Sequence, residues 1–232
     1  MNPKKILTAL LCCTLPLCTA AVAGVGQGIR GSIHDFSGRT WNSTQEICRV
    51  CHAPHDKQGE RYKAGLLWNR NLSSKTYTPY SSGSLGAGTI GQPQGLSKLC
   101  LGCHDGTVAL NAFDGYVGDG DGIGLLPNRF KIGSSIQNFS LYGTHPISVQ
   151  YVGNPKIGKP GGLHNPASIN WSYSDGMQVL KTLDNGMVQC PSCHDVHDRV
   201  AVALTPLLRA PTRKDHAGAI TASALCLTCH DK

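Results

Sequence analysis

The stretch from Cys190 to His197 is Cys-Pro-Ser-Cys-His-Asp-Val-His and contains the pattern Cys-x-x-Cys-His. This pattern is the attachment signature of c-type haem, in which both thiols bond to the porphyrin and the adjacent His ligates the iron. On a helical turn, His194 and His197 would lie on one face with Cβ atoms roughly 5–6 Å apart. Two imidazoles on one face cannot hold one iron from opposite sides of a porphyrin. We therefore expect His197 to ligate the iron of a second haem nearby.

The same pattern occurs four times. The four copies, called motifs I to IV here, are Cys48–His52, Cys100–His104, Cys190–His194 and Cys226–His230. Motif I is followed by His55 at the spacing that His197 has after motif III. Four motifs predict four covalently attached haem c groups. The expected attachment residues are Cys48, Cys51, Cys100, Cys103, Cys190, Cys193, Cys226 and Cys229.

The N-terminal segment is typical of an export signal. Lys4 and Lys5 precede an apolar run from Ile6 to Val22, and a small-x-small site ends at Ala23. The run is interrupted by Thr and Pro, so it is too short and broken for a membrane span. Residues 1–23 are expected to be a signal peptide and residues 24–232 the exported chain. A lipid anchor on a cysteine of this segment is less favoured, because each follows Leu or Cys instead of a small residue.

The cysteine count supports haem attachment. The chain has 11 cysteines, and those outside the signal segment all belong to the motifs, which leaves none for disulfides. An exported protein would ordinarily use spare cysteines as disulfides. Paired Cys-x-x-Cys is also a zinc pattern, but a zinc ribbon has no need of a His directly after each pair. The zinc alternative is therefore disfavoured at all four positions.

Composition predicts an unusual fold class. Aromatic residues make up only 6% of the chain, and Gly numbers 28. We expect a multihaem c-type cytochrome fold: mostly irregular loops with short helices wrapped on four stacked haems, and little or no sheet. The net charge of +7 includes Lys4 and Lys5 of the signal segment, and haem propionates would offset the remainder. The basic balance is thus no evidence for nucleic-acid binding, and no nucleic-acid partner is expected.

The exported chain is expected to form a single tetrahaem domain, residues 24–232, built from two related dihaem modules at about 24–117 and 140–232. Each module has an early His, then a motif with a second His, then a Leu-rich patch ending in Arg, then Cys-Leu-x-Cys-His-Asp. The patches end at Arg70 and Arg209, which we take as equivalent. The order of features repeats, although the spacing does not.

Histidine arithmetic predicts the iron ligands. Of 10 His, four are proximal by motif: His52, His104, His194 and His230. The repeat selects four distal candidates: His34, His55, His145 and His197. The remaining two, His164 and His216, have no counterpart between modules and are expected to be surface residues. Two imidazoles on every iron leave no coordination position for a substrate, so we expect an electron carrier and no enzyme.

These motifs, with His34-Asp-Phe-Ser, Leu66-Leu-Trp-Asn-Arg and Thr144-His-Pro-Ile-Ser, cover nearly the whole exported chain. The set resembles the secreted multihaem c-type cytochromes of metal-reducing bacteria, in particular the outer-membrane tetrahaem cytochromes that polymerise into extracellular filaments. The resemblance implies head-to-tail identical subunits, redox partner cytochromes, and extracellular acceptors such as metal oxides or electrodes. It also implies a distal ligand donated by a neighbouring subunit, for which His34 on the N-terminal arm is our candidate.

Three functions follow from these features. The first is extracellular electron transfer by a secreted or surface-bound filament. The second is a soluble periplasmic multihaem shuttle that never polymerises. The third is a multihaem reductase or oxidase, which would need an iron without a distal ligand. All four motifs end in His, and enough further His exist to saturate every iron, so the enzyme is the least favoured.

Overall fold

A computed structural model describes residues 28–54, 67–85, 89–116, 118, 125–132, 139–171, 176–199, 201, 205, 207–211 and 223–231. The predicted signal peptide lies outside these residues, as do His55 and His216. All four haem motifs lie inside them.

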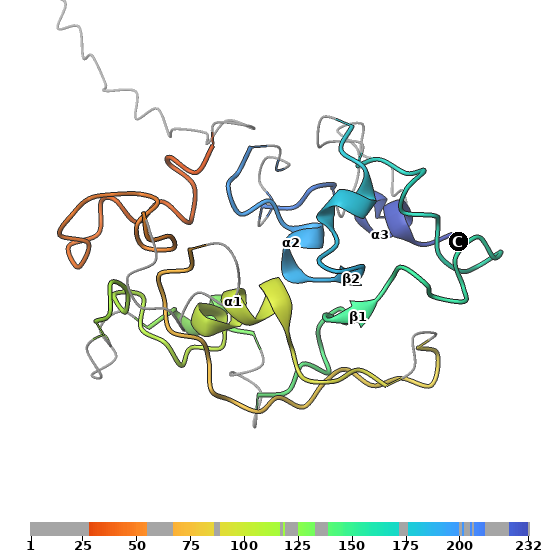
Figure 1. Ribbon diagram of the computed structural model, residues 1–232, viewed down its shortest axis with the longest axis horizontal. Coiled ribbons are helices and arrows are strands. Elements are labelled where there is room, and N and C mark those ends of the chain that lie inside the picture. The colour runs from red at the N-terminus through yellow and green to blue at the C-terminus, as the bar shows by residue number, and fades with distance from the viewer. Residues whose placement is uncertain are drawn as a thin grey trace, which may run out of the picture.

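Regular secondary structure is sparse (Figure 1). The helices are α1 (Gly95–His104), α2 (Cys190–Cys193) and α3 (Ala224–Cys229), with 3₁₀ turns η1 (Asn128–Phe130) and η2 (Val179–Thr182). Strands β1 (Val149–Gln150) and β2 (Met187–Val188) form an antiparallel pair in which Val149 faces Val188. This agrees with the expectation of loops, short helices and little sheet, although low regular content alone does not identify a haem protein.

Each motif forms a single helical turn. Motif II ends α1, motif III begins with α2, and motif IV lies on α3. Motif I is not part of a named helix, but the amide of His52 donates to the carbonyl of Cys48 at 2.8 Å. This i to i+4 bond is the bond of an α-helix, so it brings the first thiol and the His to one side of the turn.

The segment from Leu67 to Asn69 forms hydrogen bonds with the main chain in and beside motif I. The amide of Ala53 donates to Leu67 O at 2.7 Å, and the amide of Asn69 donates to Cys51 O at 2.8 Å. The Asn69 amide side chain also donates to Arg49 O at 2.6 Å, inside the motif. Leu67 has φ +51°, a left-handed conformation that turns the chain back along the motif. The turn of motif I is therefore fixed on both of its ends.

Motif III is held in the same way. The amide of Asp195 donates to Leu207 O at 2.7 Å, and the amide of Arg209 donates to Cys193 O at 2.9 Å. Arg209 Nε donates to Pro191 O at 3.0 Å, inside the motif. Leu207 has φ +59°. The local geometry of motif I is thus repeated bond for bond at motif III.

The sequence predicts that Arg70 and Arg209 are equivalent, and the repeated geometry shows that this prediction is wrong. The residue that structurally matches Arg209 is Asn69, because both use a main-chain amide and a side-chain nitrogen to bind the motif beside them. Arg70 instead matches Ala210. The two arginines end similar sequence patches, but they occupy different positions on the repeated scaffold.

The two halves of the chain meet where α2 packs against α1, and α2 also contacts η2. The amide of Cys190 donates to Ser97 Oγ at 3.0 Å, which ties motif III to α1. Asp184 caps the start of α1 by accepting from the amide of Leu96 at 3.1 Å. Gly95 has φ +54°, and a Cβ there would overlap the Asp184 carboxylate, so this crossing requires glycine. In Figure 1, α2 lies next to α1, with β1 and β2 beside them.

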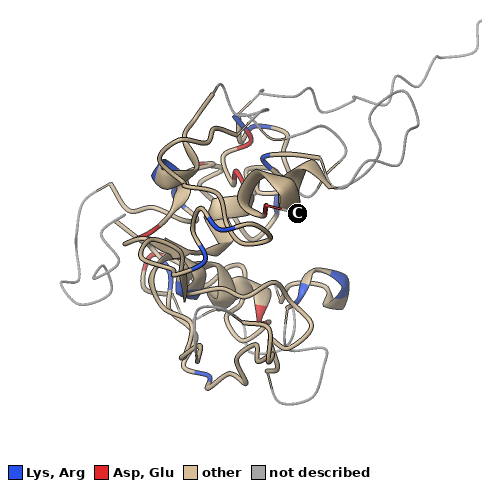
Figure 2. Ribbon diagram, turned by 90° about the vertical axis from the view of Figure 1, so that its right-hand side faces the viewer, with Lys and Arg blue, Asp and Glu red and all other residues tan. Residues whose placement is uncertain are grey.

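Apolar burial is divided between small clusters. The buried members are Tyr77, Leu101 and Leu141 in one cluster and Trp171, Val179 and Ala210 in another. Clusters of this size supply little apolar burial for a chain of this length. Charged residues are spread through both halves of the described chain (Figure 2). None of the helices in the described ranges has the length and apolar character that a bilayer crossing requires.

Candidate haem-binding sites

The thiols of the four motifs are free and lie close together. The eight motif cysteines form no disulfides. Successive motifs have neighbouring thiols. Cys51 of motif I lies near Cys103 of motif II, Cys100 of motif II lies near Cys190 of motif III, and Cys193 of motif III lies near Cys229 of motif IV. Groups attached at these positions would therefore belong to one contiguous cluster.

Burial raises the pKa of three of these thiols, those of Cys51, Cys193 and Cys229. It raises the pKa of Cys51 to about 11, and it raises that of Cys193 to about 12. Cys100 and Cys190 share a hydrogen bond, which raises the pKa of Cys100 and lowers that of Cys190. A protonated thiol reacts slowly with oxidants, so such a cysteine would stay intact until a haem is attached to it.

Three proximal imidazoles each face one predicted distal imidazole. The ring centres are separated by 6.2 Å for His34 and His104, 6.3 Å for His52 and His197, and 6.3 Å for His145 and His230.

These separations match two imidazoles on one metal. Two nitrogen–metal bonds of about 2.0–2.1 Å, with about 1.1 Å from each nitrogen to its ring centre, place the centres roughly 6.3 Å apart. Other ring pairs have similar separations, for example 6.2 Å for His34 and Phe36, so these three pairs are distinguished by the fact that each joins a motif His to a predicted distal His. In the structure the ring of His197 therefore lies opposite that of motif I, the ring of His34 opposite that of motif II, and the ring of His145 opposite that of motif IV.

Hydrogen bonds from Nδ1 to main-chain carbonyls orient two of these rings. Nδ1 of His104 donates to Phe130 O at 2.8 Å, and Nδ1 of His145 donates to Pro146 O at 2.9 Å. An imidazole whose Nδ1 proton is held by a carbonyl presents Nε2 with a free lone pair. Metal-binding histidines commonly have such a partner on the ring nitrogen that does not bind the metal.

His34 is half-buried, and its Nδ1 atom is fully buried. Burial, with the neighbouring His104, His194 and His197, lowers its pKa to about 4. Its position depends on Asp35, which accepts from the amide of Gly31 at 2.7 Å and from the hydroxyl of Ser37 at 2.6 Å. Only a neutral imidazole can donate a lone pair to a metal. His34 is therefore already in the required protonation state at neutral pH.

The position of His34 bears on its predicted assignment to a neighbouring subunit. Its ring lies against His104 of the same chain. The N-terminal arm that carries it is bonded to the second module, where the amide of Gly28 donates to Asp198 O at 3.1 Å. A side chain that already faces a proximal His within its own chain is poorly placed to ligate a haem elsewhere. The donation of His34 to a neighbouring subunit stays a prediction, whereas this structure places His34 against His104 of its own chain.

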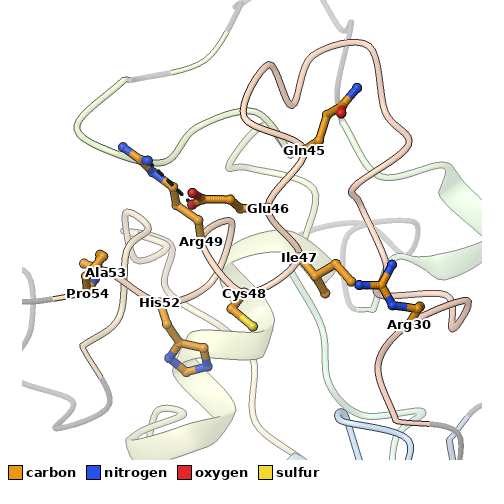
Figure 3. A pocket seen from close by; sticks show the side chains of 9 residues that line it. All are labelled: Arg30, Gln45, Glu46, Ile47, Cys48, Arg49, His52, Ala53 and Pro54. Carbon is orange, nitrogen blue, oxygen red and sulfur yellow. Dashed lines mark ion pairs between the residues drawn. The ribbon is translucent and has the colours of Figure 1, made fainter.

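A cavity of about 500 Å³ lies beside motif I. Figure 3 shows the side chains of Cys48 and His52 projecting to the same side of the motif, whereas Arg49 turns away from them toward Glu46. The cavity is lined by Arg30, Cys48 and His52 among others. Its volume falls within the roughly 300–1,000 Å³ of small-molecule and cofactor sites. A thiol and an imidazole facing one cavity are two of the three groups that a c-type haem motif contributes.

Two buried ring nitrogens near these sites have no hydrogen-bond partner. They are Nδ1 of His34 and Nε1 of Trp68, whose ring meets that of His52 edge-on with centres 6.0 Å apart. Buried donors are almost always satisfied, so each exception calls for an explanation. A bound group that fills the space between the residues explains both, and the residues present fit haem.

His55, the remaining predicted distal ligand, lies outside the described residues. His164 lies near motif IV, where its main-chain amide donates to Cys229 O at 2.9 Å. In the described ranges, no group of three or more His, Cys, Asp or Glu side chains is arranged to hold a bare metal ion. A haem site would not be detected as such a group, since the protein contributes only two axial ligands to it.

Three of the predicted distal histidines lie beside motif histidines in the structure. The sequence patterns did not predict the residues that hold the motifs in place. Asn69, Ser97 and Gln189 belong to this second set, and they are buried at 5%, 0% and 1% exposure. Nothing in their local pattern marks them, because their partners lie far along the chain. No protein-family model matches this chain, and no curated protein matches it either.

Proposed function

We propose that this protein is an exported tetrahaem c-type cytochrome that carries electrons through a cluster of four haem c groups. The observation that carries the proposal is the set of three His–His pairs, each at 6.2–6.3 Å and each joining a motif His to a histidine elsewhere in the chain. When bound, haem supplies one-electron oxidation and reduction at its iron.

The chain's own residues would do three things. The eight motif thiols would anchor the porphyrins, and the paired imidazoles would bind each iron from both sides. The carbonyls of Phe130 and Pro146 would fix the orientation of two of those imidazoles through their Nδ1 protons. The fourth pair is proposed as His194 with His55, since His197 of motif III faces motif I and the repeat makes the exchange reciprocal.

Saturated coordination favours electron transfer over catalysis at iron. An enzyme of the nitrite- or hydroxylamine-converting kind would need an open iron position, whereas the histidines here are sufficient in number to fill every one. Cys48 and Cys226, at the first and last motifs, are the exposed thiols of the described set. Sites I and IV are therefore the natural places for electrons to arrive and leave.

The location and assembly follow from the resemblance and are part of the proposal. We propose extracellular electron transfer, with identical subunits joined head to tail in a filament that delivers electrons to metal oxides, electrodes or partner cytochromes at the outer cell surface. A head-to-tail interface that does not close produces such a fibre. The alternative is a soluble periplasmic shuttle with the same haem cluster.

The test uses the full chain expressed in a host that exports and matures c-type cytochromes. Mass spectrometry of the exported protein is expected to find four haems and an N-terminus at Gly24. The electron paramagnetic resonance spectrum is expected to be low-spin throughout. A high-spin signal from one iron in four would support the enzyme instead. Electron microscopy of shed material then separates the filament from the shuttle.

A further inference from the structure

Arg70 is a buried positive charge in contact with motif I. Its side chain belongs to a residue that is only 3% exposed. Nη1 donates to Leu110 O at 2.8 Å and to Val50 O at 3.4 Å, and Nη2 donates to Ala109 O at 2.6 Å. Val50 lies between the two cysteines of motif I. The guanidinium is therefore fixed directly against the loop to which the first haem would attach.

The partners of Arg70 do not neutralise its charge. They are main-chain carbonyls, which carry partial charges only. The ion pairs found among the described residues join Arg49 to Glu46 at 3.5 Å and to Asp114 at 2.6 Å. A buried charge without a carboxylate acts strongly on its surroundings, because little water is present to screen it. Burial raises the pKa of the neighbouring Cys51 thiol, and the positive charge of Arg70 opposes this rise.

The repeated scaffold shows that this charge is not needed to hold a motif. At motif III the position of Arg70 is occupied by Ala210, which is fully buried. Arg209, one position earlier, is partly exposed and interacts with the carboxylate of Asp195. The two modules therefore share one backbone arrangement, but only the first places an uncompensated guanidinium beside its attachment loop.

We propose that Arg70 raises the reduction potential of the haem at motif I relative to that at motif III. The inference rests on the proposed function, since it needs haem at both motifs. Reduction adds one negative charge to a site, and a fixed positive charge beside the site favours that change. At the effective dielectric constant of about 20 that suits buried sites, one such charge shifts a neighbouring one-electron equilibrium by about tenfold, or about 59 mV.

The experiment is a potentiometric titration of the exported holoprotein, followed by its visible spectrum, for the wild type and for three variants. Arg70→Gln removes the charge and keeps a donor. Arg70→Lys keeps the charge and loses the forked geometry. Arg49→Gln is the matched control, because it removes a guanidinium from the same motif that is already paired with the carboxylates of Glu46 and Asp114 (Figure 3).

We expect Arg70→Gln to make one haem in four about tenfold harder to reduce, while Arg70→Lys and Arg49→Gln stay close to the wild type. The proposal is overturned if Arg70→Gln binds four haems and titrates like the wild type. It is also overturned if Arg70→Lys shifts as far as Arg70→Gln, or if both variants lose the motif I haem, since Arg70 would then be structural only. A wild-type protein without four haems would refute the proposed function itself, and mass spectrometry reports that separately.

Discussion

The pairing of His197 with motif I leads to a sharp prediction. His197 follows motif III in sequence, yet its ring centre lies 6.3 Å from that of His52, with an interplanar angle of 23°. Replacing it by Ala leaves a methyl group that cannot reach an iron held by His52. We expect one iron in four to lose its distal ligand, and that iron to belong to motif I and not to the motif that carries the mutation.

The magnitude follows from the structure. His197 is exposed in the polypeptide, so its truncation removes little packing and acts mainly through the lost iron ligand. Carbon monoxide binds reduced haem iron only where an axial position is open. The reduced His197→Ala protein should therefore bind about one carbon monoxide per chain, whereas the wild type should bind none. Added imidazole should restore the low-spin spectrum by replacing the missing ring.

His164→Ala is the matched control. His164 is a partly buried histidine whose main chain bonds to Cys229 and Tyr151, and it faces no proximal His in the described ranges. Its variant should bind no carbon monoxide. The reasoning is refuted if His197→Ala stays fully low-spin with four haems. It is equally refuted if the open iron, located by peptide mapping after modification, is the one attached at motif III.

Three further predictions concern single sites. His34→Ala should open one iron even in a monomeric preparation separated by gel filtration, and an effect that required assembled subunits would contradict the pairing within one chain. Ser97→Ala should leave the Cys190 amide unsatisfied and destabilise the protein by about 1–3 kcal/mol in chemical denaturation; an unchanged midpoint would show that the crossing of α1 and α2 does not depend on this bond. Asp105→Asn should lower the thermal midpoint, because the buried carboxylate accepts from the Tyr77 hydroxyl at 2.5 Å and charged acceptors form the stronger bonds. A variant that melts with the wild type would show that the negative charge of Asp105 does not contribute to stability.

Sequence alone determined what is local. A Cys-x-x-Cys-His pattern spans one turn of helix, so its chemistry is complete within five residues and does not depend on the rest of the chain. The attachment sites and proximal ligands are predictions of this local kind, whereas the predicted sparseness of regular structure agrees with the structure. The i+3 spacing of His194 and His197 also showed that the second ring serves a different site.

Tertiary structure decided which residues meet. His197 faces His52 from the other module, and His34 faces His104, because the path of the connecting loops and the crossing of α1 with α2 bring them together. It also showed that Arg70 is a buried charge with carbonyl partners, although its sequence patch resembles that of Arg209. Contacts across many residues depend on how the whole chain packs, and no local pattern encodes that packing.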